Sequence, residues 1–503
     1  MKQNIQKKLD QKQEKIKSQL NNARNKYNPK NPEISSSKIK YDISDRVGAM
    51  VNGGLGAIHN LVLKVGLTKD INDGLSLLKV HKPYHESDHA LNLAYNSLCG
   101  GSTLDDIELL RNDQNHLNAL GADSIPDPTT SGDFCRRFKE QDIVSLMDIV
   151  NRNRLKVWNE QPKSFFKEAN IDIDGVIVGT TGECKEGIGL SYKGIWGYHP
   201  LLVSLAETKE PLFIVNRSGN RPSQDECGVW LDRAANLCKS AGFEKIRFRG
   251  DSAFALTEHF DTWNSKGIYF VFSNASHPHL IDGAEAFDEP NDWDILERKV
   301  QKEFERQRPE NVKQQIVEEK GYLDLKQKAE DIIEFLHRPS KCGKDYRVVA
   351  VRRLISVQRF GKELFEEYRY FFYITNDDSL NMYEVVKHSN IRCDQENLNE
   401  QLQNGTRSLK APLDSLNSNW AWMVMTSLAW TLKSWAALLL PEDEVSAKQN
   451  QADSRLLLKM EFRTFVNRFI KIPAQVIRHS RSVTLRLLAW RQDLPILFRL
   501  SML

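Results

Sequence analysis

The spacing of hydrophobic residues changes character along the chain. Between residues 71 and 150, apolar residues recur at helical spacing in short segments separated by glycines and prolines, so we expect a bundle of short helices there. From residue 170 onward, short alternating or continuous apolar runs are typical of strands. Five strands are expected, with one well-marked helix, at 170–178, 201–205, 212–215, 227–241 (the helix), 245–249 and 268–272.

This order, with a second helix before the last strand, is βββαβαβ, the plan of an RNase H-like mixed sheet. Residues 274–389 are too long and too patterned for a loop, and they predict an inserted α+β subdomain with a charged helical stretch (296–336) and two strands (346–357 and 368–375). A helix at 391–409, a Trp-rich helix at 420–440 and two basic amphipathic segments at 456–470 and 473–490 complete the chain.

The fold class is therefore α/β, with an RNase H-like core, an inserted subdomain, a helical N-terminal DNA-binding region and a helical C-terminal region. A linker containing Pro29, Pro32 and Ser35 to Ser37 follows a polar N-terminal segment. The expected regions are a basic tail or helix (1–45), the helical region (46–165), the first part of the core (166–273), the insertion (274–389), the rest of the core (390–445) and a basic helical end (446–503).

Charge is distributed unevenly. The formal net charge of +3 conceals +8 within residues 1–40 and +7 within residues 451–503, so the body between them is acidic. Basic ends suit contact with a polyanion such as DNA, although Lys-rich ends can also be merely solvated tails. Within the helical region, Arg136 and Arg137 are candidate DNA contacts; a purely structural bundle is the alternative.

The sequence gives no support for a secreted, membrane-bound or nucleotide-binding protein. The seven cysteines are scattered singly, which indicates reduced thiols in a cytosolic protein. The N-terminus lacks the apolar core of a signal peptide, and the apolar 420–440 stretch carries Lys433 and several hydroxyl residues, so we interpret it as a buried helix and expect no membrane contact. Glycine-rich turns between strand and helix are absent, so no nucleotide cofactor is expected. A cytoplasmic, nucleoid-associated prokaryotic protein fits this pattern.

Acidic residues stand where an RNase H-like sheet would bring them together. Asp174 lies on the first strand and Asp251 ends the fourth, and adjacent parallel strands would place them side by side. On the 391–409 helix, Arg392 and Glu396 are four residues apart and share a face, on which Gln403 falls again. Carboxylates converging from three elements can hold two Mg²⁺ or Mn²⁺ ions, the usual means of cleaving and rejoining a phosphodiester.

Alternatives remain for several of these positions. Asp172 shares a face with Asp174 and could be the first ligand, and Glu400 could support Glu396 from one turn away. Glu183 and Glu186 lie in a glycine-rich turn where acids are often only solvated. His199 has no partner at ligand spacing and is interpreted as a structural strand residue.

Long phrases of the sequence resemble prokaryotic transposases of the insertion sequence 1380 family from about residue 45 to the C-terminus. Among them are IDIDGVIVGTTGECKEG, SYKGIWGYHPLLVSLAET, RFRGDSAF, RCDQENLNEQLQNG, NWAWMVMTSLAWTLKSWAALLLP and KPYHESDHALNLAYNSLCGG. The resemblance implies a DDE transposase that binds the terminal inverted repeats of its element, cuts the DNA and transfers the strand, and that works as a dimer or higher oligomer on DNA. It implies that Asp174, Asp251 and Glu396 hold the metal and that Arg392 contacts phosphate.

Two positions in the family's Tyr–Arg–Glu–Lys signature differ here: Ser389 stands in place of Tyr and Gln403 in place of Lys. Val176 also replaces the Thr that follows the first acid. These changes motivate a second hypothesis, a DNA-binding regulator that occupies the repeats without cutting. A third is an RNase H-like nuclease that cuts DNA but cannot join ends.

Overall fold

The computed structural model describes residues 2–25, 47–287, 292–296, 312–442, 447–479 and 482–503. The expected linker with Pro29, Pro32 and Ser35 to Ser37 lies outside these ranges. The chain divides into two compact units. We call Met1–Glu160 with Gln401–Leu503 the helical unit, and Gln161–Glu400 the sheet unit.

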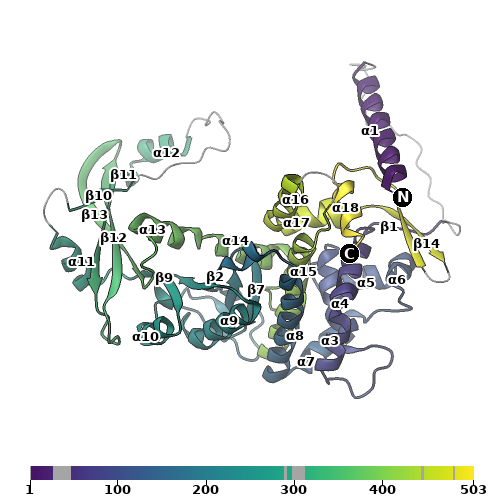
Figure 1. The fold of residues 1–503 in the computed structure, drawn as a ribbon, viewed down its shortest axis with the longest axis horizontal. Helices are drawn as coiled ribbons and strands as arrows, with labels where there is room; N and C mark the ends of the chain where they lie inside the picture. The colour runs from purple at the N-terminus through teal and green to yellow at the C-terminus, as the bar shows by residue number, and fades with distance from the viewer. Residues whose placement is uncertain (1, 26–46, 288–291, 297–311, 443–446, 480–481) are drawn as a thin grey trace. The chain divides into compact units, whose positions relative to one another are not determined.

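The sheet unit is built on a nine-stranded mixed sheet with the order β10-β11-β12-β13-β9-β8-β2-β6-β7 (Figure 1). Its strands are β2 (Glu168–Gly175), β6 (Leu201–Leu205), β7 (Glu210–Val215), β8 (Lys245–Gly250), β9 (Ile268–Asn274), β10 (Asp294–Ile295), β11 (Asp324–His337), β12 (Tyr346–Arg359) and β13 (Lys362–Thr375). Strands β2, β6 and β7 pair antiparallel, whereas β8 runs parallel to both β2 and β9. These pairings confirm the expected meander and the parallel strand pair.

Helices cover both faces of this sheet. They are η1 (Lys163–Lys167), α9 (Cys227–Ala241), η2 (Ser252–Phe254), α10 (Thr257–Ser265), α11 (Pro278–Glu285), α12 (Val312–Lys320), α13 (Met382–Ile391) and α14 (Asp394–Glu400). Helices α9 and α10 lie on one face and α13 and α14 on the other (Figure 1). A small sheet of β3 (Val178–Gly179), β5 (Trp196–Tyr198) and β4 (Gly189–Leu190) follows β2.

The face under α9 and α10 is apolar. Trp263 of α10 packs edge-on against Phe248 of β8 with ring centroids 5.1 Å apart, and Phe260 stacks on Phe270 of β9 at 4.2 Å. Helix α9 ends as its sequence predicts, because Gly242 adopts a left-handed conformation (φ 96°) that closes the helix.

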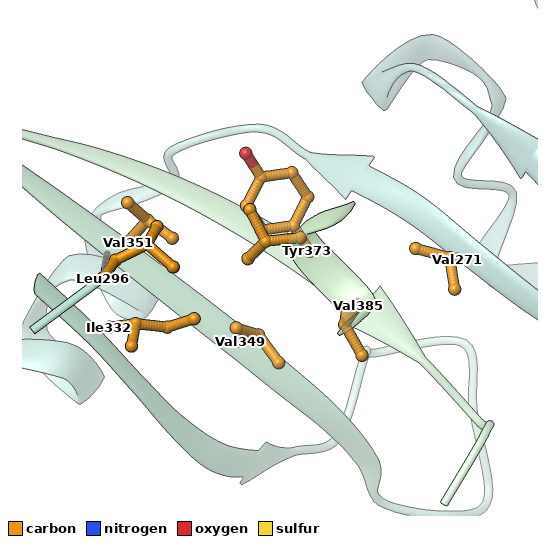
Figure 2. Packing of buried hydrophobic residues seen from close by; sticks show 8 residues of the cluster. Val271, Leu296, Ile332, Val349, Val351, Tyr373 and Val385 are labelled. Atoms are coloured by element: carbon orange, nitrogen blue, oxygen red, sulfur yellow. The ribbon is translucent and has the colours of Figure 1, made fainter. Parts of the chain in front are cut away.

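The insertion contains three long strands, one more than expected. Residues 324–336, expected to be helical, form β11, which pairs with β12. Its charged residues pair across the strands: Arg352 contacts Asp331 at 2.9 Å and Arg353 contacts Glu330 at 2.7 Å. Charges typical of a helix surface therefore stabilise a strand pair. A hydrophobic cluster that includes Ile332, Val349, Val351 and Val385 joins the inserted strands to β9 and α13 (Figure 2).

The helical unit surrounds one buried helix, α15 (Leu416–Leu438), which packs against α2, α4, α7, α8 and α16. Every residue of α15 from Ser418 to Ala437 is buried. The other elements are α1 (Lys2–Asn25), α2 (Leu55–Val65), α3 (Leu67–Gly74), α4 (Glu86–Leu98), α5 (Ile107–Arg111), α6 (Gln114–Leu120), α7 (Pro128–Arg136), α8 (Glu140–Asn159), η3 (Gln401–Gly405), α16 (Ala447–Lys459), α17 (Phe462–Phe465), η4 (Val466–Ile470) and α18 (Leu494–Leu500), with strands β1 (Ala49–Met50), β14 (Ala474–His479) and β15 (Ser482–Leu487).

Two features of this unit differ from expectation. The segment 473–490, expected to be a basic helix, forms the β14–β15 hairpin, and β14 also pairs with β1. Its β-branched residues, such as Val476 and Val483, favour strands. Residues 401–445, expected to complete the catalytic core, group with the N-terminal helices because α15 packs among them. No helix in the described ranges is long and apolar enough to cross a bilayer.

Candidate active site

Two carboxylates lie side by side where β2 and β8 end. These strands are parallel, and their register places Asp172 opposite Arg249. Asp174 and Asp251 each follow two residues later, so they lie at the same level at the ends of adjacent strands. The charge of Asp251 contributes to raising the pKa of Asp174, which agrees with this proximity. The structure therefore brings together the first two acids predicted from the sequence.

Asp174 is held by two hydrogen bonds. The backbone N–H of Gly175 donates to Oδ1 at 2.9 Å, and the side-chain amide of Asn399 donates to Oδ2 at 2.7 Å. Burial, followed by the negative charge of Asp251, raises the pKa of Asp174 to about 6, although these hydrogen bonds and Arg392 oppose the shift. Two partly buried carboxylates in contact repel each other, and a cation placed between them would relieve that repulsion.

Asp251 caps the short helix η2. Its Oδ1 accepts a hydrogen bond of 2.9 Å from the backbone N–H of Ala253. This contact fixes the carboxylate at the point where β8 leaves the sheet. In the sequence GlyAspSer, the carboxylate is therefore positioned by a local turn as well as by the end of the strand.

Asp172, the alternative first ligand, forms an ion pair with an arginine instead. Both of its oxygens accept hydrogen bonds from Arg249, at 2.6 and 2.8 Å, and the side chains of both residues are about 2% exposed. Such a bidentate ion pair satisfies both groups in the interior. Asp172 is therefore a partner of a buried arginine beside the site, and Asp174 is the acid at the strand end.

The expected helix 391–409 is broken. Helix α13 ends at Ile391, Arg392 is its C-terminal cap, and α14 begins at Asp394 and ends at Glu400. Backbone hydrogen bonds from Cys393 to Asn390 and from Gln395 to Arg392 form the turn between them. As a consequence Ile391, expected to pack on the sheet, is 42% exposed, whereas Leu398 is buried as expected.

Burial raises the pKa of both Asp172 and Asp174, and the positive charge of Arg392 opposes that rise at each of them, so Arg392 lies near both acids. Its Nε is buried and donates no hydrogen bond in this structure. A buried guanidinium N–H without an acceptor is costly, and an anionic oxygen would satisfy it. This geometry suits the phosphate contact expected of Arg392.

Glu396 is exposed on α14, three residues before Asn399. Its carboxylate does not form a group with the other two: in the described ranges, no ligand atoms of Asp174, Asp251 and Glu396 all lie within 4.8 Å of one another. The helix presents Asn399 to Asp174 instead. The structure thus places two of the three expected acids at the ends of adjacent strands and the third about one helical turn from Asn399, which donates a hydrogen bond to Asp174.

The sequence pattern did not single out the amides of α14. Gln395 is buried and hydrogen-bonded to Ser204 of β6, and Asn399 contacts Asp174. The Oδ1 atom of Asn399 is buried and accepts no hydrogen bond in this structure. It is a hard oxygen donor on a side chain that contacts Asp174, so together with the carboxylates of Asp174 and Asp251 the donor set fits a magnesium or manganese ion. The i+3 spacing from Glu396 was the available signal for Asn399.

The remaining candidate DNA-contacting residues lie in the helical unit. Arg136 forms ion pairs with Asp133 at 2.7 Å and with Asp414 at 3.0 Å, and Arg137 is exposed at the end of α7. Gln403 is partly buried in η3 of the helical unit. These placements neither test nor exclude DNA contact.

Two further positions have structural roles. Ser389, which stands where the family has Tyr, is buried and shares a hydrogen bond with Ser273 of β9. His199 is buried, as interpreted for a structural residue. Its Nδ1 lies 2.9 Å from the backbone oxygen of Arg221, and its Nε2 lies so close to Gly175 that a Cβ at that glycine would approach within 2.7 Å.

Comparison with protein families decides the identity of the chain. A family model described as "Transposase DDE domain group 1" matches residues 37–494, which is most of the sequence. The chain belongs to this transposase family. The match extends over both units and covers Asp174, Asp251 and Glu396.

Other comparisons are weaker. Among solved structures, the chain is similar to one described as a cryo-EM structure of piggyBac transposase synaptic complex with hairpin DNA. That likeness has a TM-score of 0.37 and 10% sequence identity, and it covers 84% of this chain and 86% of that chain. No curated protein sequence matches the chain.

Proposed function

We propose that this member of the transposase DDE family mobilises an insertion sequence of the 1380 family, by binding its terminal inverted repeats and catalysing metal-dependent DNA cleavage and strand transfer. The observation that carries the proposal is the juxtaposition of Asp174 and Asp251 at the ends of two adjacent parallel strands. The sheet supports it further, because its strands β7-β6-β2-β8-β9 have the order and directions of an RNase H-like core.

Each residue of the site has its own role in this proposal. Asp174, Asp251 and Glu396 would hold Mg²⁺ or Mn²⁺, and such ions activate the attacking oxygen and stabilise the leaving oxygen when two are bound. Asn399 orients the carboxylate of Asp174. Arg392 offers its unsatisfied Nε to a DNA phosphate oxygen.

The reaction has two steps of the same kind. Water attacks a phosphorus atom at the element's end, the bond to the 3′ oxygen breaks, and the 3′ oxygen takes up a proton to leave a hydroxyl. That hydroxyl then attacks a phosphodiester of the target DNA, which forms the new bond and releases a 3′ hydroxyl there. Both steps develop charge on phosphate oxygens, which Arg392 is placed to stabilise.

The test uses the purified full chain, DNA carrying one element end, and Mg²⁺. The wild type should nick at the repeat boundary, and Glu396→Gln should lower the cleavage rate by at least about 100-fold, because it removes a charged metal ligand. Glu244→Gln, which alters an exposed acid of the sheet unit outside the candidate site, is the matched control and should cleave normally. Cleavage by Glu396→Gln at the wild-type rate would refute the assignment of the third acid.

The same assay separates the alternatives. Binding to the repeat without cleavage in Mg²⁺ or Mn²⁺ would select the regulator, a hypothesis motivated by Ser389 and Gln403. Cleavage without joining of precleaved ends to a target would select a nuclease. Joined products that disappear in Asp174→Asn and Asp251→Asn would support the transposase.

A further inference from the structure

Two histidines and a glutamate meet in the helical unit where the chain enters α4. One ligand atom from each of His81, His85 and Glu86 lies within 4.8 Å of the others. The two imidazole rings stack with centroids 4.8 Å apart and an interplanar angle of 19°. Nε2 of His81 lies 3.1 Å from Oε2 of Glu86. None of these residues belongs to the acid pair on the sheet.

The carboxylate of Glu86 is held as a ligand would be. Its side chain is 1% exposed, and Oε1 accepts hydrogen bonds from the backbone N–H groups of Leu77 (3.1 Å) and Leu78 (3.0 Å). The other oxygen, Oε2, is buried and accepts no hydrogen bond. The backbone therefore fixes Oε1, while Nε2 of His81 lies 3.1 Å from Oε2 and 3.4 Å from Oε1. Outer hydrogen bonds commonly orient metal-binding carboxylates in this way.

The side chains of both histidines are exposed to solvent. The side chain of His81 is 46% exposed, and His85 is exposed at the N-terminal cap of α4. The backbone N–H of His85 donates to the side chain of Asp88 at 2.7 Å, which fixes the start of the helix and hence the position of the ring. An ion can thus enter from solvent and reach a buried, oriented oxygen.

Two readings of this cluster compete. A protonated His81 could form an ion pair with Glu86, but a proton on His85 as well would place two positive charges in stacked rings. A metal ion uses both imidazoles and the oxygen Oε2 at once. Imidazole with carboxylate is a donor set that suits zinc, whereas magnesium prefers oxygen alone.

We propose that His81, His85 and Glu86 bind a transition-metal dication such as Zn²⁺, with water as the fourth ligand. Tetrahedral zinc with bonds of about 2.0–2.1 Å separates its ligand atoms by about 3.3 Å. The contact between His81 and Glu86 is close to this length at 3.1 Å, and a ligand atom of His85 lies within 4.8 Å of both. The ion ties the loop after α3 to the first turn of α4, so it stabilises this part of the helical unit.

The experiment uses the metal-stripped full chain in excess Mg²⁺, which occupies oxygen-only sites. Calorimetric titration with Zn²⁺ should give one high-affinity equivalent, and Co²⁺ should give the visible absorption of a tetrahedral site. His81→Ala and His85→Ala alter exposed side chains, and each should weaken Zn²⁺ binding by more than about 100-fold, since losing a ligand exceeds the cost of losing an outer partner. Zn²⁺ should raise the melting temperature of the wild type but not of Glu86→Gln.

A second histidine cluster provides the control. His277 and His279 stack with centroids 5.5 Å apart, and His279 also stacks on His337 at 5.1 Å. His279→Ala should bind Zn²⁺ like the wild type. The proposal is overturned if the wild type binds no stoichiometric Zn²⁺, if His85→Ala binds as tightly as the wild type, or if His279→Ala loses the high-affinity equivalent. A pH-dependent but Zn²⁺-independent melting temperature would assign the cluster to the ion pair instead.

Discussion

The carboxyl group of Asp174 occupies a setting that opposes its ionisation. Burial and the charge of Asp251 raise its pKa from 3.8 to about 6, even though Asn399 and Gly175 donate hydrogen bonds to it. The site is therefore built at the expense of stability, as is common for groups that await a ligand. In the absence of metal, this unfavourable setting should lower the stability of the folded protein, and the loss of stability should depend on pH.

We predict that Asp174→Asn stabilises the metal-free protein at pH 7–8 by up to about 3 kcal/mol. Because the pKa of Asp174 is higher in the folded state than in the unfolded state, the wild type loses stability as the pH rises from about 3.8 through about 6, and the variant avoids that loss. Asn399 can turn its amide so that Oδ1, which accepts no hydrogen bond, faces the new side chain.

Calorimetry in EDTA between pH 4 and pH 8 measures this effect. The difference between variant and wild type should vanish near pH 4 and be complete above about pH 6. Mg²⁺ should stabilise the wild type and leave Asp174→Asn unchanged. The exposed change Asp378→Asn should show neither effect. A variant less stable than the wild type at pH 8 would contradict the assigned charge repulsion.

At the residue scale, the sequence identified the acidic residues of the candidate site better than its amide residues. Asp174 and Asp251 could be identified because strand ends and family phrases both mark them. Asn399 could not, since an amide on a polar helix is ordinary until the sheet beneath it is known. The helical position of Glu396 was predicted, but the extra helix α13 before it and the end of α14 at Glu400 were not, because no glycine or proline marks the turn after Ile391.

At the scale of elements, strand β8 carries buried charges on the face under α13. Arg247 is 1% exposed and pairs with the fully buried Asp377 at 2.5 Å and with Glu168. Lys245 also contacts Asp377, at 2.8 Å. Burial would raise the pKa of Asp377, but hydrogen bonds from Lys245, Ser379 and Arg247 outweigh it and lower that pKa to about 2. This network joins β2, β8 and the segment after β13.

We predict that Asp377→Asn destabilises the sheet unit by about 3–5 kcal/mol, because it leaves the buried Arg247 without its main counter-charge. In the wild type, the low pKa of Asp377 contributes about 2 kcal/mol above pH 3.8 that is lost as the pH falls through about 2. Chemical denaturation at pH 7 measures the loss. The neighbouring exposed change Asp378→Asn is the control, and equal stability of the two variants would contradict the role of the network.

The elements that the sequence predicted well are those whose hydrophobic pattern is unambiguous. Helix α9 has one buried face, and strands β6 to β9 are short runs in which most residues are buried. Strand β11 was predicted as helical because its many charges are typical of a helix surface. In the structure they pair with β12, as in the contact between Asp331 and Arg352, which are 21 residues apart. The β14–β15 pairing is local and its β-branched residues favour strands, but the added pairing of β14 with β1, near the other end of the sequence, is one that no local pattern can reveal.

At the scale of the whole molecule, positive charge lies at the two ends of the chain and negative charge in the body. Helix α1 holds much of the N-terminal charge, and four of its lysines with exposed side chains are Lys7, Lys8, Lys12 and Lys15. The sequence alone predicted this division, because net charge is additive along a chain and needs no fold. If the ends contact DNA, their lysines displace counterions from phosphates, and binding must then depend on salt.

We predict that changing these four lysines to glutamine lowers the slope of log K against log salt by up to about 3.6, since each phosphate contact contributes about 0.9. The loss should be equal for repeat and unrelated DNA, because phosphate contacts carry no sequence information. A matched control changes four exposed lysines of the acidic body, Lys313, Lys320, Lys344 and Lys362, and should keep the wild-type slope. An unchanged slope in the α1 variant would mean that α1 is a solvated helix and that DNA is held by other surfaces.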